Sequence, residues 1–207
     1  PKPSSAASDV YKRQIYGHGT HKVSLLDCGL KKNILVSLAK NDCTVTVYPC
    51  HTTAAEMLAD NPDGIFLSPG PGDPLDVPYV ISAVKELIGK KPIFGICLGI
   101  QMLSLALGAH TFKLPFGHRG SNHPVKDLRT GRVYITSQNH GYAVSDEELP
   151  ECIEVTHRSV NDGTIEGFCH KTLPIQAVQY HPEASPGPTD NFYLFKEFVK
   201  AMEDAKR

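Results

Sequence analysis

The chain has 207 residues, of which 41% are hydrophobic and 21% charged, and its formal net charge at pH 7 is -1. This composition excludes an intrinsically disordered or collagen-like chain, and the length suits one large α/β domain. The balance of 21 Lys and Arg against 22 Asp and Glu argues against a nucleic-acid or anionic-membrane binder, because such a protein needs an extended positive surface.

The first 14 residues are polar, rich in Pro and Ser and without periodicity, so we expect a disordered or non-native tail before a domain at 15–207. From residue 22 onward, apolar strands alternate with amphipathic helices. Strands are predicted at 22–27, 44–48, 64–67 and 92–96, and helices at 31–39, 54–59, 77–88 and 98–107. This alternation is typical of a parallel sheet covered on both faces.

After Gly108 the segments become shorter and are punctuated by glycine. Strands of antiparallel or mixed pairing are predicted at 132–136, 153–156, 164–169 and 175–179, and a closing helix at 189–205. For the whole chain we predict an α/β fold with an open mixed, mostly parallel sheet flanked by helices.

The segment Gly95-Ile96-Cys97-Leu98-Gly99 lies where a predicted strand turns into a helix. A G-x-C-x-G at this place is typical of a nucleophile elbow with cysteine as the nucleophile. The start of the helix presents free backbone N–H groups and a positive dipole end, which stabilise a thiolate. The alternative is that Cys97 is a small buried residue at a glycine-lined turn.

A second motif, Gln179-Tyr180-His181-Pro182-Glu183, follows the last predicted strand. Residues two apart in an extended segment point to the same side, so Glu183 can orient the imidazole of His181. A nucleophile needs a base and the base an orienting group, so Cys97, His181 and Glu183 are the candidate catalytic residues.

The stiff loop Ser68-Pro69-Gly70-Pro71-Gly72-Asp73-Pro74 follows the third strand. Its few backbone N–H groups, that of Gly72 among them, could join the N–H of Leu98 in an oxyanion hole. Because no G-K-[ST] follows, we do not expect this loop to bind a nucleotide.

Four segments, FGICLGIQ, SPGPGDP, SQNHGYAV and QYHPEASPGP, together resemble class I (triad) glutamine amidotransferases. Within that family, FGHRGSNHPV followed by SQNHGYAV is similar to the small-chain group of carbamoyl-phosphate synthetases. The resemblance implies a flavodoxin-like fold and hydrolysis of the L-glutamine side-chain amide through a cysteinyl thioester.

By the same resemblance, the substrate-binding residues lie in three short segments. They are Gly70 and Gly72 in the proline-rich loop, Leu98 and Gln101 at the helix start, and Asn139, Gly141 and Tyr142 in SQNHGYAV. A zwitterionic ligand needs paired donors and acceptors, and the amide of Gln101 offers both.

The family pattern is not matched everywhere. Ile100 stands where relatives usually have His, Tyr142 where Phe is common, and the additional N-terminal domain of the small chains is absent from this sequence. We expect the Ile100 difference to change packing rather than activity. The missing domain puts in doubt the coupling of hydrolysis to carbamoyl-phosphate formation.

Other interpretations of the Cys and His residues are weaker. His118 and His123 could bind a metal but are better explained as loop or partner contacts, so no metal site is predicted. Cys28 is the rival nucleophile and His140 an alternative base, while Cys169 and His170 are neighbours on a strand and point to opposite faces.

The resemblance also implies partners. L-glutamine and a carbamoyl-phosphate synthetase large chain are expected, without nucleic acid or membrane, and no cofactor is expected in this chain because ATP and Mg²⁺ would act on the large chain. Scattered thiols without a signal peptide indicate a reducing, cytoplasmic location. The alternatives are an amidotransferase subunit of another synthetase and a non-catalytic regulatory subunit.

Overall fold

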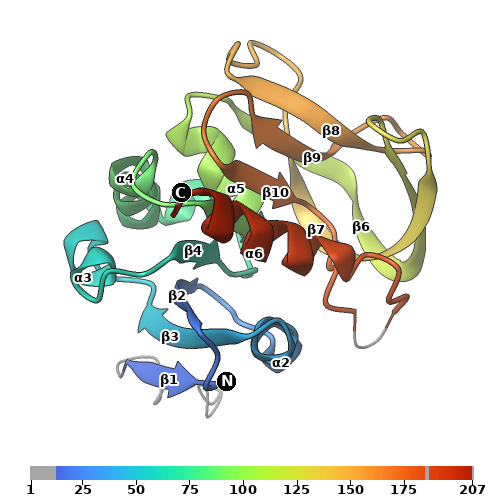
Figure 1. The fold of residues 1–207 in the computed structure, drawn as a ribbon. Helices are drawn as coiled ribbons and strands as arrows, with labels where there is room; N and C mark the ends of the chain where they lie inside the picture. Colours follow the sequence, from blue (N-terminus) through green and yellow to red (C-terminus); the bar gives the residue numbers. More distant parts are fainter. Residues whose placement is uncertain (1–12, 185–186, 207) are drawn as a thin grey trace, which may run out of the picture.

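The computed structural model describes residues 13–184 and 187–206 (Figure 1). Its helices are α2 (Lys32–Lys40), α3 (Ala54–Ala59), α4 (Pro78–Leu87), α5 (Leu98–Ala106) and α6 (Tyr193–Asp204), with a short 3-10 helix at Pro74–Asp76. Its strands are β1 (Gln14–Tyr16), β2 (His21–Asp27), β3 (Cys43–Pro49), β4 (Gly64–Leu67), β5 (Ile93–Ile96), β6 (Thr111–Asp127), β7 (Val133–Val144), β8 (Ile153–Ser159), β9 (Ile165–His170) and β10 (Ile175–Val178).

The predicted N-terminal tail falls mostly on residues 1–12, which lie outside the described residues. Its last residue, Gln14, begins β1, a strand that the sequence analysis did not predict. β1 pairs antiparallel with β3 and forms the edge of the sheet.

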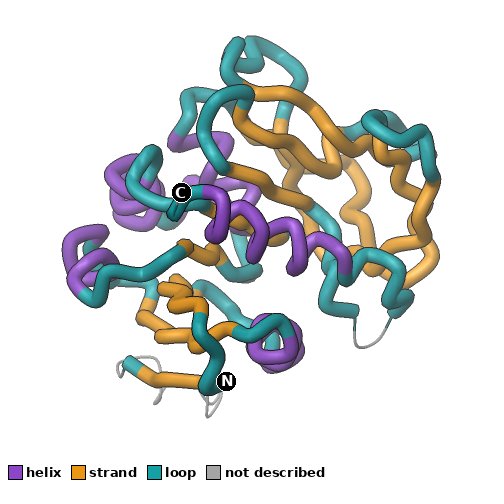
Figure 2. The backbone as a smooth tube through the Cα atoms, viewed as in Figure 1, coloured by secondary structure: helices purple, strands orange, loops and turns teal. Residues whose placement is uncertain are grey.

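Five strands form the parallel half of the sheet, in the order β3-β2-β4-β5-β10. Successive side chains of a strand point to opposite faces. Thus Ile65 and Leu67 of β4 pack in one core cluster with α3, α4 and α5, whereas Phe66 packs in a second cluster with α2 and α6. Helices therefore cover both faces of this half, as Figure 2 shows.

The prediction of an open, mostly parallel sheet is wrong for the molecule as a whole. Among the described residues, six of the ten strand pairings are antiparallel. Strands β6–β9 moreover pair in the order β9-β7-β6-β8, and β8 pairs back onto β9, so these four strands close on themselves. We call them the closed antiparallel unit.

The error has a simple physical cause. A parallel connection needs a crossover, usually through a helix. Helices separate the strands from β2 to β5, but none of the described residues between β6 and β10 is helical. Strands β6–β9 therefore pair only with antiparallel neighbours, and β10 alone returns to pair in parallel with β5. The alternation of strands and helices before Gly108 therefore does not predict how the later strands pair.

The longest strands, β6 and β7, are built from segments rich in glycine and proline. Their pairing is interrupted between Lys113 and His118 and again between Gly120 and His123. Pro and Gly are tolerated at such irregularities because ladder hydrogen bonds are missing there. This explains why the sequence analysis predicted a loop at FGHRGSNHPV, where the structure has a strand.

None of the described helices is long and apolar enough to cross a bilayer. The uncharged run around residues 92–111 instead forms β5, the turn after it and the buried helix α5.

Four phenylalanine rings hold α6 against the parallel strands. Phe66 lies at the centre, with ring centroids 5.3 Å from Phe94, 6.3 Å from Phe195 and 6.0 Å from Phe198. All four side chains are buried.

Replacement of Phe66 by Ala should lower the free energy of unfolding by about 3–5 kcal/mol, because it opens a cavity among packed rings. The matched control is Phe116→Ala, since Phe116 is 88% exposed and should change stability by less than about 0.5 kcal/mol. Urea unfolding followed by circular dichroism measures both. If Phe66→Ala does not fold, Phe66→Leu can be measured instead and should show a smaller loss of unfolding free energy. Equal stability of the Phe66 and Phe116 variants would contradict the central place of Phe66 in the core.

Candidate active site

The turn between β5 and α5 places Cys97 in a strained conformation, with φ 55° and ψ -104°. A side chain on either flanking glycine would collide with backbone: a Cβ on Gly95 would lie 2.8 Å from the carbonyl carbon of Gly99, and one on Gly99 would lie 2.6 Å from the oxygen of Leu67. Only glycine fits at both positions. The local structure is therefore the sharp strand-to-helix turn that the motif predicts.

Cys97 lines a cavity of about 360 Å³ at this end of the parallel strands. The residue as a whole is 3% exposed, and its Sγ lies 3.9 Å from the carbonyl oxygen of Asn139. Its backbone N–H donates to Val178 of β10 at 2.9 Å, which fixes the turn against the neighbouring strand. The backbone of Cys97 is thus fixed, and the residue lies at the wall of the cavity.

His181 lines the same cavity and lies three residues beyond the end of β10. Its Nδ1 is 2.7 Å from Oε1 of Glu183, and its backbone N–H donates to Ser137 of β7 at 2.9 Å. Burial by itself would lower the pKa of His181, but interaction with Cys97 and the hydrogen bond to Glu183 outweigh burial and raise that pKa to about 9. Thiol, imidazole and carboxylate therefore form one connected group.

Glu183 is fully buried and does not line the cavity. Nζ of Lys31 lies 3.6 Å from its Oε1, and Nδ2 of Asn33 donates to its backbone carbonyl. A buried carboxylate needs such positive or hydrogen-bonding partners. Lys31, just before α2, and Asn33, within α2, therefore hold Glu183 in place at the end of this group of three side chains.

The loop after β4 forms one wall of the cavity through Pro69, Gly70, Pro71 and Gly72. Gly70 approaches the chain closely, because a Cβ there would lie 2.5 Å from the oxygen of Cys28. Gly72 has φ +95°, which favours glycine. Both glycines therefore line the cavity that Cys97 and His181 share.

The opposite wall comes from β7, whose Asn139, Gly141 and Tyr142 all line the cavity. Gln101 connects this wall to α5, since its Nε2 donates to the carbonyl of Tyr142 at 2.8 Å and to Oε1 of Gln179 at 3.1 Å. Leu98 differs from the other candidates: its side chain packs in the core, and only its place at the start of α5 associates it with the site.

The lining residues that were not candidates in the sequence analysis include Gly29, Lys31 and Arg119. Gly29 and Lys31 follow β2, a neighbour of β4 in the parallel half, and ligands of such sheets bind beyond the carboxyl ends of the strands. That rule could have identified Gly29 and Lys31 as cavity residues from the sequence. No such rule applied to Arg119, because the sequence predicts a loop for its segment.

The rival residues lie in different surroundings. Burial raises the pKa of the Cys28 thiol, which disfavours a thiolate there, and Cys28 does not line the cavity. His140 lines the cavity, but burial lowers its pKa to about 4 and its Nδ1 lies 2.8 Å from the Tyr142 carbonyl. Cys169 lies beside Glu154, whereas His170 accepts hydrogen bonds from the turn after β9. Ile100 is fully buried in the core, in agreement with a packing role.

Residues 24–201 match the family described as glutamine amidotransferase class-I. Among curated proteins, the chain is similar to "Carbamoyl phosphate synthase small chain" of Akkermansia muciniphila, at 57% identity over 90% of this chain and 50% of that protein. It is likewise similar to the protein of the same name from Clostridium perfringens, at 56% identity over 95% of this chain and 55% of that protein. The chain thus spans about half the length of the curated relatives it matches.

Two solved structures share the fold. One, described as a putative GMP synthase subunit from Thermoplasma acidophilum, has a TM-score of 0.80 at 23% identity and covers 91% of this chain and 97% of its own. The other, a glutamine amidotransferase from Thermotoga maritima, has a TM-score of 0.66 at 18% identity, covering 91% and 84%.

Glu183→Gln should lower the pKa of His181 by about one unit or more, because it removes the carboxylate that stabilises the imidazolium. A titration of the imidazole resonances by NMR measures this. In the wild type, a histidine pKa raised from 6.5 to about 9 on folding adds stability that is complete below pH 6.5 and lost as the pH rises through 9. Glu183→Gln should therefore flatten the fall of unfolding free energy over that range.

The control is Glu56→Gln, which removes a carboxylate from the cap of α3 and should leave the His181 titration unchanged. An unshifted His181 in Glu183→Gln would contradict the proposed electrostatic link between the two residues.

Proposed function

Because this chain belongs to the class I glutamine amidotransferase family, we propose that it hydrolyses the side-chain amide of L-glutamine to glutamate and ammonia through a thioester on Cys97. The observation that carries the proposal is that Cys97 and His181 line one cavity, with Glu183 buried behind His181 and hydrogen-bonded to it. A non-catalytic regulatory subunit would not need this group of three.

The proposed reaction is acyl transfer in two steps. The Cys97 thiolate attacks the amide carbon while His181 holds the thiol proton, and the tetrahedral intermediate collapses as His181 gives that proton to departing ammonia. Water, deprotonated by His181, then attacks the thioester and releases glutamate, and the proton returns to the thiol. Glu183 stabilises the imidazolium formed in both steps.

The oxyanion of each intermediate needs donors close to the thiol. We propose the backbone N–H groups of Leu98 and Gly72, one at the start of α5 and the other in the loop wall of the cavity. Loss of one such donor typically costs about 3 kcal/mol of transition-state stabilisation.

The amino-acid end of glutamine would lie between the two walls of the cavity. Asn139, Gly141 and Tyr142 offer β7 backbone groups, while Gly70 offers those of the loop. Lys31 and Arg119 add positive charge to the lining, which suits a substrate with an α-carboxylate.

We further propose that the ammonia serves carbamoyl phosphate synthesis on a large chain. The support is the name of the relatives, which are 56–57% identical, whereas the structure described as a GMP synthase subunit is 23% identical. The hydrolysis uses only side chains and water, so we propose no cofactor for it in this chain and assign ATP and Mg²⁺ to the large chain. An intracellular, cytoplasmic location is part of the same proposal.

Cys97→Ser should abolish glutamine-dependent ammonia release, because serine is a far weaker nucleophile than a thiolate at neutral pH. Cys28→Ser is the matched control and should keep most of the activity, since its thiol lies outside the cavity. Ammonia release is measured directly, and mass spectrometry after treatment with a glutamine-mimicking electrophile shows which thiol is labelled. Equal activity of the two variants, or labelling at Cys28 alone, would overturn the assignment.

Gln101→Leu should raise the KM for glutamine about tenfold with a smaller effect on kcat, because it removes the hydrogen bond that holds Tyr142 in the wall. Gln176→Leu, a substitution in β10 away from the cavity lining, serves as the control. Steady-state glutaminase kinetics give both constants. An unchanged KM in Gln101→Leu would remove this residue from substrate positioning.

The partner is tested by co-purification. A tagged form of this chain should recover a large ATP-dependent synthetase chain from its source cells. Recovery of a chorismate-using subunit instead would redirect the proposal to another synthetase without affecting the glutaminase step.

A further inference from the structure

Polar side chains fill part of the interior of the closed antiparallel unit. Along β7 the buried residues alternate, with Thr136, Gln138 and His140 on the inner side. His118 of β6 and Glu166 of β9 are buried beside them. Interiors of such small units are normally apolar, so this cluster requires an explanation.

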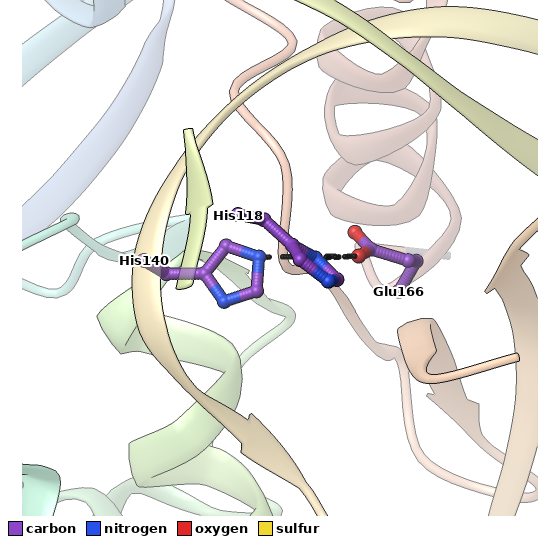
Figure 3. Close-up of side chains that lie close together, drawn as sticks. All are labelled: His118, His140 and Glu166. Carbon is purple, nitrogen blue, oxygen red and sulfur yellow. Dashed lines mark ion pairs between the residues drawn. The ribbon is translucent and has the colours of Figure 1, made fainter. Parts of the chain in front are cut away.

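Three of these residues bring ligand atoms together, as Figure 3 shows. Nδ1 of His118 lies 3.4 Å from Oε1 of Glu166, and Nε2 of His140 lies 3.9 Å from the same oxygen. One ligand atom from each of the three residues lies within 4.8 Å of the others. Ligands about 2.1 Å from a tetrahedral zinc are separated by about 3.4 Å, so the two contacts with Glu166 are near the spacing of a metal site, and the cluster would contract slightly around an ion.

The outer ring nitrogens of the two histidines each face a hydrogen-bond acceptor. Nδ1 of His140 lies 2.8 Å from the carbonyl of Tyr142, and its Nε2 lies 3.0 Å from Oε1 of Gln138. Both partners are acceptors, so a neutral ring donates to one of them, and the tautomer that donates to Tyr142 leaves a lone pair on Nε2. Nε2 of His118 lies 2.8 Å from the carboxylate of Asp162, which places the proton of a neutral ring there and leaves the lone pair on Nδ1. Both lone pairs then face Glu166.

Two atoms at this centre lack a hydrogen-bond partner among the described residues. Nδ1 of His118 and Oε1 of Glu166 are buried without a hydrogen-bond partner, and the 3.4 Å contact between them does not have hydrogen-bond geometry. The amide of Gln138 donates to Oε2 of Glu166 and to Thr136, so its own oxygen, 3.0 Å from Nε2 of His140, is a further acceptor. Acceptors that converge in a buried place need a positive charge between them, which either a metal ion or a proton on one of the rings supplies.

We propose that His118, His140 and Glu166 bind a divalent transition-metal ion such as Zn²⁺ inside the closed antiparallel unit. Two imidazoles and a carboxylate suit zinc better than Mg²⁺ or Ca²⁺, which prefer oxygen ligands. Asp162 and the Tyr142 carbonyl hold the outer nitrogens of the two rings, an arrangement typical of metal-bound histidines.

The ion would tie together β6, β7 and β9, the strands that carry its three ligands. His140 is also a cavity-lining residue between Asn139 and Gly141, so the ion would stiffen one wall of the cavity without touching the thiol. The role is structural and independent of the proposed glutaminase chemistry. It also revises the sequence analysis, which paired His118 with His123; the latter instead contacts the backbone of Arg119.

The test is a titration of chelator-treated protein with Co²⁺, followed by visible absorption, and with Zn²⁺, followed by calorimetry. Wild type should bind one equivalent with the absorption of a tetrahedral cobalt site that lacks thiolate ligands. His118→Asn and Glu166→Gln should lose stoichiometric binding. Asp162→Asn, at a more exposed position outside the three ligands, should weaken binding by about 10–100-fold.

Two controls separate this site from other donors. His123→Asn should bind like wild type, because His123 neighbours His118 but offers no ligand to the cluster. Cys97→Ser should also bind like wild type, which distinguishes the cluster from the thiol and His181. Circular dichroism checks that each variant is folded.

Retained binding in Glu166→Gln and His118→Asn, or loss of binding in Cys97→Ser, would overturn the proposal. Absence of one-to-one binding in wild type would do the same, and would mean that a proton on His118 holds the cluster together. None of these outcomes depends on glutaminase activity, so the two proposals fail separately.

Discussion

The strand-to-helix turn at Cys97 is the constraint on which the site depends. A non-glycine residue with positive φ outside the helical regions costs about 1–3 kcal/mol, and only tight surroundings maintain it. Those surroundings are the contacts of Gly95 and Gly99 with backbone that a side chain would block, together with the hydrogen bond from Cys97 to β10. The packing of the parallel half therefore determines where the thiol points.

The pairing of β5 with β10 brings the rest of the chemistry to that thiol. The two strands are parallel and in register, so that Ile96 lies beside Val178 and both chains leave the sheet at the same edge. Cys97 and His181 follow directly, although more than eighty residues separate them in sequence. The intervening residues include the closed antiparallel unit, which returns Asn139 and Tyr142 to the same cavity.

The sequence predicted the features that are set locally and missed those set by distant contacts. The helices and apolar strands up to α5, the turn at Cys97 and the pairing of His181 with Glu183 all follow from spacing within a few residues. β6 was missed because Pro115, Gly117 and Gly120 are typical of loops, and only its pairing with β7 makes the segment a strand. Closure of β8 onto β9 and the approach of Arg119 to the cavity depend on register between strands, for which a single sequence carries no local signal.

The two walls of the cavity belong to different layers of the molecule. The thiol, the imidazole and the proline-rich loop are anchored in the helix-covered parallel half, whereas the wall at Asn139–Tyr142 is a strand of the closed antiparallel unit. These walls are connected at the site by the hydrogen bond of Gln101 with Tyr142 and by that of the His181 backbone with Ser137. A small rotation of the closed antiparallel unit against the parallel half would consequently change the distance between Cys97 and the wall at Asn139–Tyr142. A protein bound to the closed antiparallel unit could therefore alter the rate of turnover without entering the cavity.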